Sequence, residues 1–464
     1  MSIYKQHLKT NGFETNIYIL YLFFLPFSRF IDFNMPHIFQ TYLFNRFSCF
    51  FFFIGCIIMM VKKVKLYSPI LHQWIKLYLF QVVYSLLMAC VLFIPLGSLN
   101  GEDSIRAVTG GIIFWLIVIL HLFYNYYGLT HLIKSKTFFR TVTLATVILL
   151  ITGYLQYAAI NIGGVFNTIY SALTSIFALL PIEHLNRGVV FWGSEPSSAS
   201  ILFILIIPVL VTQIILLAHT KDQKKYILLY ILFLPLFLSS NSASVLITLL
   251  VNIITTVILL FRNYKFYRIF IFIVFFIGLY VAINYGIGSF NENPTTVSEE
   301  QENLKYLLFG KIQDTNNLST MMRSSTIINN MKIFFEYPLT GVGDGIQGFF
   351  YNENIPQNYL LSPEVTKIYN GESGIIDSGG AFFPAFLSSY GIIGLFFLVP
   401  LIKQYYNCLR CEKTGHYNLI FLVFIPSFIL SAWFNMGIRQ NYIVILLFSI
   451  PIATLYKNLH NIKE

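Results

Sequence analysis

Stretches of about 20 apolar residues recur along this chain from one end to the other. They lie near 15–33, 42–61, 74–96, 107–127, 138–160, 197–218, 226–240, 243–261, 268–287, 381–402, 417–434 and 441–456. A helix of such residues crosses the hydrocarbon core of a bilayer and satisfies its own backbone there. The chain is 56% hydrophobic and 11% charged, whereas a soluble domain typically carries about 25% charged residues. We therefore predict an all-α fold, a polytopic membrane bundle of about 12 transmembrane helices.

The pair 226–240 and 243–261 is the weakest part of this prediction, because only the short polar turn Ser239–Ser242 separates the two stretches. A single re-entrant feature is the alternative there.

The distribution of lysine and arginine predicts the orientation. With the N-terminus in the cytoplasm, 20 of the 30 Lys and Arg residues fall in inner segments, and every inner connection is basic. We therefore expect both termini to be cytoplasmic and the number of spans to be even. The start, Met1 to Asn16, is followed by no small-residue cleavage site, so the first span is expected to stay uncleaved. The net charge of +10 comes from these connections, and we expect no nucleic-acid partner.

Arginine is the basic residue of the short outward segments, where it occurs as Arg29, Arg46, Arg106, Arg187 and Arg439. Its planar guanidinium can bind phosphate through two parallel hydrogen bonds. We expect the set to include phosphate-binding residues, while snorkelling or structural ion pairs would explain individual members.

The chain divides into three parts. A transmembrane bundle over 1–287 carries an outer loop at 161–196, a large outer loop covers 288–380, and the bundle resumes over 381–464. The large loop is too long and too polar for a connection, so we expect a small folded lid. In it, Met321 to Glu336 predicts an amphipathic helix lying on the bundle or the lipid interface, with Arg323 in its first turn. Its apolar residues at helical spacing are Ile327, Ile328, Met331, Phe334 and Phe335.

A glycine-rich segment, Gly341 to Gly345, follows Pro338. Glycines let a backbone approach a neighbour closely, and such a loop can bind phosphate through its amides. A tight turn that returns the chain to the membrane is the simpler interpretation.

The smaller outer loop predicts a second interfacial helix, from Val165 to Leu180. Glu195 stands after it, immediately before Pro196 at the mouth of the sixth span. A carboxylate there either caps the helix or has a functional partner. His184 lies in the same loop and is expected to be structural.

Cys408 and Cys411 form a C-x-x-C pair, but the sequence offers no second pair for a zinc site. No other metal-ligand spacing stands out. We therefore expect no metal and no cofactor.

The order of these segments resembles the O-antigen polymerases of the Wzy type, which share a membrane fold with the O-antigen ligases. The resemblance covers the topology of the whole chain, and motif matches over 187–200 and 323–394. The matching segments are Arg323 ahead of a helix, Glu336–Gly343, Asp377–Gly379 leading to Tyr390–Gly394, and Glu195–Ser197.

The resemblance implies a glycosyltransferase of lipopolysaccharide biosynthesis. Such an enzyme joins undecaprenyl-pyrophosphate-linked repeat units at the periplasmic face of the bacterial inner membrane. Its partners would be these lipid-linked glycans, the lipid bilayer and a chain-length regulator protein. Asp377 is the leading candidate for the base or for the residue that orients the acceptor, followed by Glu195.

The implied cationic contacts to pyrophosphate are Arg187 and Arg323 in the catalytic site. Arg439 and Arg29 follow them as substrate-binding residues, together with Gly341 and Gly343.

Three alternatives stay open. The first is an O-antigen ligase, although ligases carry a functional His in the large outer loop and residues 288–380 contain none. The second is a lipid-linked oligosaccharide flippase or another transporter, which usually shows repeated halves. The third is a sensor or scaffold without chemistry.

Overall fold

The structure is a computed structural model. It describes residues 12–27, 47–66, 68–93, 98–99, 102–177, 179–185, 188–192, 196–240, 243–261, 264–287, 318–370, 381–411, 416–434 and 442–459. Over these residues the regular secondary structure is helical apart from β1 (Ser98–Leu99) and β2 (Glu102–Asp103), which pair antiparallel. The predicted all-α class is confirmed.

Each predicted apolar stretch contains a helix. These helices are α1 (Gly12–Phe24), α3 (Phe47–Val61), α4 (Pro69–Met88), α5 (Ser104–Tyr127), α6 (Ser135–Asn161), α8 (Pro196–Leu216), α9 (Gln223–Ser239), α10 (Ala243–Leu260), α11 (Tyr264–Ile287), α16 (Phe382–Cys411), α17 (His416–Phe434) and α18 (Tyr442–Leu459). The stretch 226–261 thus contains two helices, and two separate crossings there stay a prediction. Short π-helical turns, η1 (Ala89–Phe93) and η3 (Gly128–Leu132), extend α4 and α5.

Four helical segments of the described chain are long and apolar enough to cross a membrane: Pro69–Leu92, Ile105–Leu132, Ser135–Asn161 and Phe382–Arg410. Five shorter apolar helical segments accompany them, Phe47–Val61, Ile204–Leu216, Val245–Leu260, Asn418–Trp433 and Tyr442–Asn458. This pattern identifies a membrane protein. A full set of twelve crossings stays a prediction.

Glycines allow aromatic rings to lie directly on helix backbones. The ring of Tyr124 occupies the space that a Cβ would need at Gly55, and Tyr18 does the same at Gly128. Trp433 covers Gly278 in this way. Small residues that admit such close approach are typical of helix interfaces in membranes.

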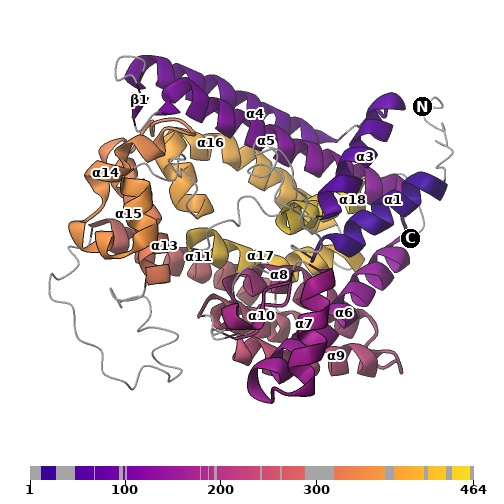
Figure 1. Ribbon diagram of the computed structural model, residues 1–464. Helices are drawn as coiled ribbons and strands as arrows, with labels where there is room; N and C mark the ends of the chain where they lie inside the picture. The colour runs from indigo at the N-terminus through magenta and orange to yellow at the C-terminus, as the bar shows by residue number, and fades with distance from the viewer. Residues whose placement is uncertain are drawn as a thin grey trace.

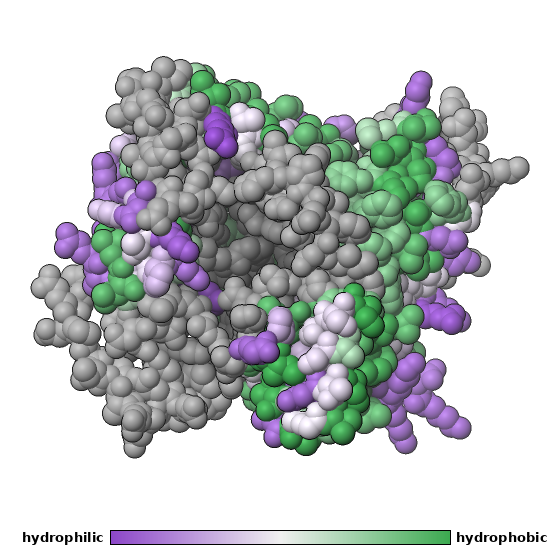
Figure 2. All heavy atoms as spheres, in the orientation of Figure 1, coloured by the Kyte–Doolittle hydropathy of each residue, from purple (hydrophilic) through white to green (hydrophobic). Residues whose placement is uncertain are grey.

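The segment between α11 and α16 folds onto the bundle. It consists of α13 (Leu318–Glu336), η6 (Gln347–Phe350), α14 (Tyr351–Asn354), η7 (Gln357–Leu361) and α15 (Pro363–Tyr369). Ile328 and Met331 of α13 share a hydrophobic core with Tyr351, Val365 and Trp433. We call the end of the molecule that carries these elements the loop end (Figure 1). Figure 2 shows hydrophilic residues over α14 and α15 and along the opposite edge, with apolar surface next to that edge.

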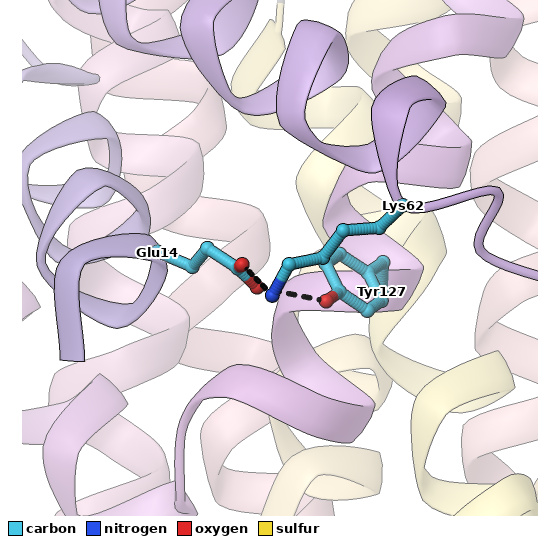
Figure 3. Close-up of polar contacts among 3 residues, drawn as sticks. All are labelled: Glu14, Lys62 and Tyr127. Carbon is cyan, nitrogen blue, oxygen red and sulfur yellow. Dashed lines mark hydrogen bonds and ion pairs between the residues drawn. The ribbon is translucent and has the colours of Figure 1, made fainter. Parts of the chain in front are cut away.

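The opposite end, here the basic end, is held together by a buried carboxylate. Glu14, at the start of α1, forms an ion pair with Lys62 after α3 and accepts a hydrogen bond of 3.1 Å from the hydroxyl of Tyr127 on α5 (Figure 3). Lys457 of α18 donates to the carbonyl of Ile133 at the same end. The positions of these lysines agree with the basic connections noted in the sequence.

The smaller predicted interfacial helix is present as α7 (Val165–Ile176). Val165 and Ile176 are 72% and 67% exposed, and Tyr170 is its buried anchor. Tyr170 donates a hydrogen bond to the carbonyl of Leu180 and accepts one from Gln156. Burial raises the pKa of Tyr170 to about 12, so the hydroxyl keeps its proton at neutral pH. The apolar residues that α7 leaves exposed are those expected of a helix at a lipid interface.

Removing Lys62 should destabilise the basic end, because Glu14 would keep a buried charge without its cation. Breaking a buried ion pair from one side costs about 3–5 kcal/mol. We expect the stability lost in the Lys62→Met variant to lie near the lower end of this range, since the Lys62 side chain is 28% exposed. The measurement is the thermal unfolding midpoint of the purified protein in detergent.

The control is Lys65→Met, which changes an exposed lysine of the same connection. Glu14→Gln combined with Lys62→Met should recover part of the loss. Equal midpoints for wild type and Lys62→Met would contradict a stabilising role for the pair.

Candidate functional site

Helix α16 is broken at Gly391. This residue has φ 55° and ψ −154°, a conformation that essentially only glycine adopts. The break divides the longest described helix into segments 382–390 and 392–411. Carbonyl groups at the end of the first segment and amides at the start of the second therefore lose their helical partners.

The loop that follows α13 replaces these partners. Two amides of the loop donate to the first segment of α16, and two amides of the second segment donate to the loop. The four bonds are Val342 N to Ser388 O, 2.9 Å, Gly343 N to Ser389 O, 2.8 Å, Ile392 N to Pro338 O, 3.0 Å, and Ile393 N to Leu339 O, 3.1 Å. Loop 338–343 thus bridges the break in α16, and we call this arrangement the splice. It meets the requirement that backbone groups in a bilayer be satisfied inside the protein.

The close fit of the splice explains its glycines. Gly341 has φ 64°, and a Cβ there would collide with the backbone of Ser388 and Ser389. A Cβ at Gly391 would collide with the backbone of Leu339 and Thr340. The two segments therefore touch backbone to backbone.

A buried polar seam joins α13 to the first segment of α16. We use this name for Asn329, Asn330, Gln347, Ser388 and Ser389, all 0–1% exposed. Asn330 accepts a hydrogen bond of 2.6 Å from Ser388 Oγ, and Gln347 Nε2 donates to Ser389 Oγ. Asn329 Nδ2 donates to the carbonyl of Gln347 over 2.9 Å. The seam holds α13 in one register against α16.

This seam corrects the prediction for Met321–Glu336. The helix is present as α13, and Ile327, Ile328 and Met331 are buried as expected. Asn329 and Asn330 are buried as well, because their amides pair across the interface. The helix is therefore enclosed over most of its length, and its polar residues do not form a solvent-facing stripe.

Asp344 of the glycine loop lies between α4 and α5. Its side chain accepts a hydrogen bond of 3.0 Å from Trp115 Nε1, and its amide donates to Ser85 Oγ over 2.9 Å. Tyr84 of α4 donates to the carbonyl of Thr340 over 2.6 Å. The loop is thus seated in the bundle as well as in the break of α16.

The amides of the glycine loop are all engaged inside the protein. Gly341 N donates to the carbonyl of Tyr337, and Gly345 N donates to Gln347 Oε1 over 3.0 Å. The amides between them donate to Ser388, Ser389 and Ser85 as described above. This geometry favours the tight-turn interpretation of the loop over a phosphate cradle built from its amides. Contacts from Gly341 and Gly343 to a substrate stay predictions.

Of the predicted site residues, the structure describes Arg323, Gly341 and Gly343. Arg323 lies on α13 with a partly buried side chain, and α13 carries the polar seam that meets the glycine loop. The other predicted residues, Arg29, Arg187, Glu195, Asp377 and Arg439, lie outside the described residues. The structure therefore connects Arg323 to the glycine loop, through α13 and the polar seam.

Asp344, Trp115 and the polar seam also belong to this arrangement and were not predicted from the sequence. One available signal was the spacing of Thr326 and Asn330, which places two polar groups four residues apart, next to the apolar residues Ile327 and Met331. Another was the pair Ser388-Ser389 inside an apolar stretch. Within the part of the chain that the structure describes, no cluster of three His, Cys, Asp or Glu side chains is arranged to hold a metal ion.

Comparisons of this chain with known protein families, with curated proteins and with solved structures gave no match.

Substituting Gly391 should disrupt the splice. Alanine at φ 55° costs about 1–3 kcal/mol in backbone strain alone, and its Cβ would also push the Leu339–Thr340 backbone away. We expect the Gly391→Ala variant to unfold at a clearly lower temperature than wild type in detergent.

The matched control is Gly12→Ala, since no atom lies within 4 Å of a Cβ built at Gly12. If both variants unfold at the wild-type temperature, the close approach at Gly391 is not needed for the fold.

Proposed function

We propose that this chain is a membrane glycosyltransferase that joins undecaprenyl-pyrophosphate-linked oligosaccharide repeat units, as an O-antigen polymerase of the Wzy type does. The observation that carries the proposal is the spliced helix. It fixes α13, with Arg323, against an apolar bundle at the loop end, and a site for charged, lipid-carried substrates needs such rigid support.

The reaction would proceed by attack of a sugar hydroxyl of one repeat unit on the anomeric carbon of the glycan carried by the other lipid. A new glycosidic C–O bond forms, and the C–O bond to pyrophosphate breaks with its electron pair leaving on undecaprenyl pyrophosphate. A carboxylate, for which Asp377 and then Glu195 are the candidates, accepts the hydroxyl proton. Arg323 and Arg187 would stabilise the charge on the departing pyrophosphate. Arg439 and Arg29 are further candidates for contact with it.

This proposal includes a location. Twelve crossings with both termini in the cytoplasm place 288–380 and the short arginine-bearing segments on the periplasmic side of the inner membrane. The basic end, with Lys62 and Lys457, would then face the cytoplasm, in agreement with the retention of lysine on that side. The bilayer, the lipid-linked glycans and a chain-length regulator are the proposed partners, without nucleic acid.

A transporter or flippase is the second candidate, because helices broken at membrane depth are frequent at transporter binding sites. In such sites the freed backbone groups face a substrate or an ion. The carbonyls of Ser388 and Ser389 instead accept amides of the protein's own loop. This difference favours a break that supports a neighbouring site over a break that itself binds a transported substrate. A ligase is disfavoured by the absence of His from 288–380.

The decisive experiment supplies the purified protein in vesicles with synthetic undecaprenyl-pyrophosphate repeat units. A ladder of longer glycans is expected from a polymerase. Transfer of unchanged lipid across the vesicle membrane without a ladder would favour the flippase.

Arg323 should be required for the ladder. We expect the Arg323→Ala variant to lose at least about 100-fold in polymer formation, because a group that stabilises charge in the transition state is removed. Polymer formation by Arg323→Lys should lie between that of wild type and that of Arg323→Ala, since lysine keeps the charge but not the bidentate geometry.

Arg140→Ala is the matched control, an exposed arginine at the start of α6 that the proposal assigns to the cytoplasmic side. Membrane insertion and the unfolding temperature should stay at wild-type values in all three variants. A full-length ladder from Arg323→Ala would remove Arg323 from the mechanism.

The orientation can be tested without any activity. Lys367, on α15, is exposed, so a Lys367→Cys variant in a Cys90→Ser, Cys411→Ser background should react in intact cells with a maleimide that reaches the periplasm but does not cross the inner membrane. A Lys221→Cys variant, at an exposed position between α8 and α9, should react only after the cells are permeabilised. The reverse pattern would overturn the orientation and the chemistry drawn from it.

A further inference from the structure

Asp344 is a buried carboxylate whose purpose the proposed reaction does not explain. Its residue is 3% exposed, in a loop surrounded by α4, α5 and α16. A carboxylate removed from water is costly unless hydrogen bonds compensate it. Its burial indicates a role inside the protein, because a base that meets a substrate must be reachable.

Two helices build the seat for Asp344, α5 for its carboxylate and α4 for its backbone amide. Trp115 of α5 donates to Oδ2 over 3.0 Å, and Ser85 of α4 accepts the Asp344 amide over 2.9 Å. Gly111 stands one turn before Trp115, where a Cβ would come within 3.1 Å of Oδ2. The next loop residue, Gly345, lies against the backbone of α5 at Ala107 and Val108. The seat therefore combines the Trp115 donor for the carboxylate, the Ser85 acceptor for the amide and the space left by Gly111.

The same loop leads to α13. Gly345 donates to Gln347, whose carbonyl accepts from Asn329 of α13. Val342 and Gly343 donate to the first segment of α16. A change at the Asp344 seat is therefore passed through the loop to both elements that support the site.

We propose that Asp344 is a positioning residue: its side chain, held by Trp115, and its backbone amide, held by Ser85, fix the spliced loop to α5 and α4 and thereby hold α13 in the arrangement that the site needs. The effect on activity rests on the proposed function, whereas the effect on the loop does not.

Three substitutions test this role. Trp115→Phe removes the donor and keeps the ring shape, and Asp344→Ala removes the acceptor. Asp344→Asn keeps an oxygen that Trp115 can bind and removes the charge. Trp74→Phe is the matched control, because it removes an indole donor whose hydrogen bond of 3.2 Å to Tyr405 joins α4 to α16 without involving the glycine loop.

Hydrogen exchange of the protein in nanodiscs measures the loop directly. We expect the amides of 341–346 to exchange at least about tenfold faster in Trp115→Phe and Asp344→Ala, while α17 and α18 keep wild-type rates. Asp344→Asn and Trp74→Phe should leave the loop close to wild type. A uniform increase over all helices would indicate general destabilisation and overturn a local positioning role.

Polymer formation is the second readout. Trp115→Phe and Asp344→Ala should lower it mainly through kcat, and Asp344→Asn should stay within about tenfold of wild type, because only the charge assistance of one hydrogen bond is lost. If Asp344→Asn is as inactive as Asp344→Ala while its loop amides stay protected, the charge itself acts in the reaction and the positioning role is wrong. If wild type yields no ladder but the exchange pattern is as stated, the proposed function fails and the anchoring of the loop stands.

Discussion

The need to satisfy backbone hydrogen bonds away from water governs the arrangement at the loop end. A helix broken inside a bilayer exposes carbonyl and amide groups that no solvent can bind. In α16 the break at Gly391 is tolerated because the loop 338–343 supplies an acceptor or a donor to each side of it. The position of the loop, and of everything attached to it, follows from this exchange of partners.

Buried polar groups then determine which elements stay together. At the loop end, the polar seam joins α13 to α16, and Asp344 joins the loop to α4 and α5. At the basic end, Glu14 joins α1 to α3 and α5. In an apolar environment each of these groups has few alternative partners, so each contact specifies one arrangement of helices more strongly than apolar packing does.

The proposed chemistry depends on this division of roles. Groups that bind a charged substrate have to be accessible, whereas the groups that hold them in place can be buried. Arg323 is partly buried on α13, and the seam residues that hold this helix are enclosed. A polymerase that handles two lipid-carried substrates at once would benefit from such a support, because small displacements of a reacting group are costly in rate.

Sequence by itself determined where the long apolar helices lie, but not the short helices of 347–369. Apolar length is a local property, and each of the apolar stretches found by it contains a helix, as do the predicted α7 and α13 regions. It also indicated that Gly341–Gly345 forms a tight turn. Sequence did not indicate the break at Gly391, since the residues around it read as one continuous apolar span.

Only the tertiary structure decided the partners. Trp115 and Asp344 are 229 residues apart, and Glu14 and Tyr127 are 113 residues apart, so no local pattern connects them. The burial of Asn329 and Asn330 likewise depends on side chains that α16 and the loop bring to them. Hydropathy depends on each residue and its near neighbours, whereas a buried hydrogen bond depends on two segments meeting, which is why the first could be derived from the chain and the second could not.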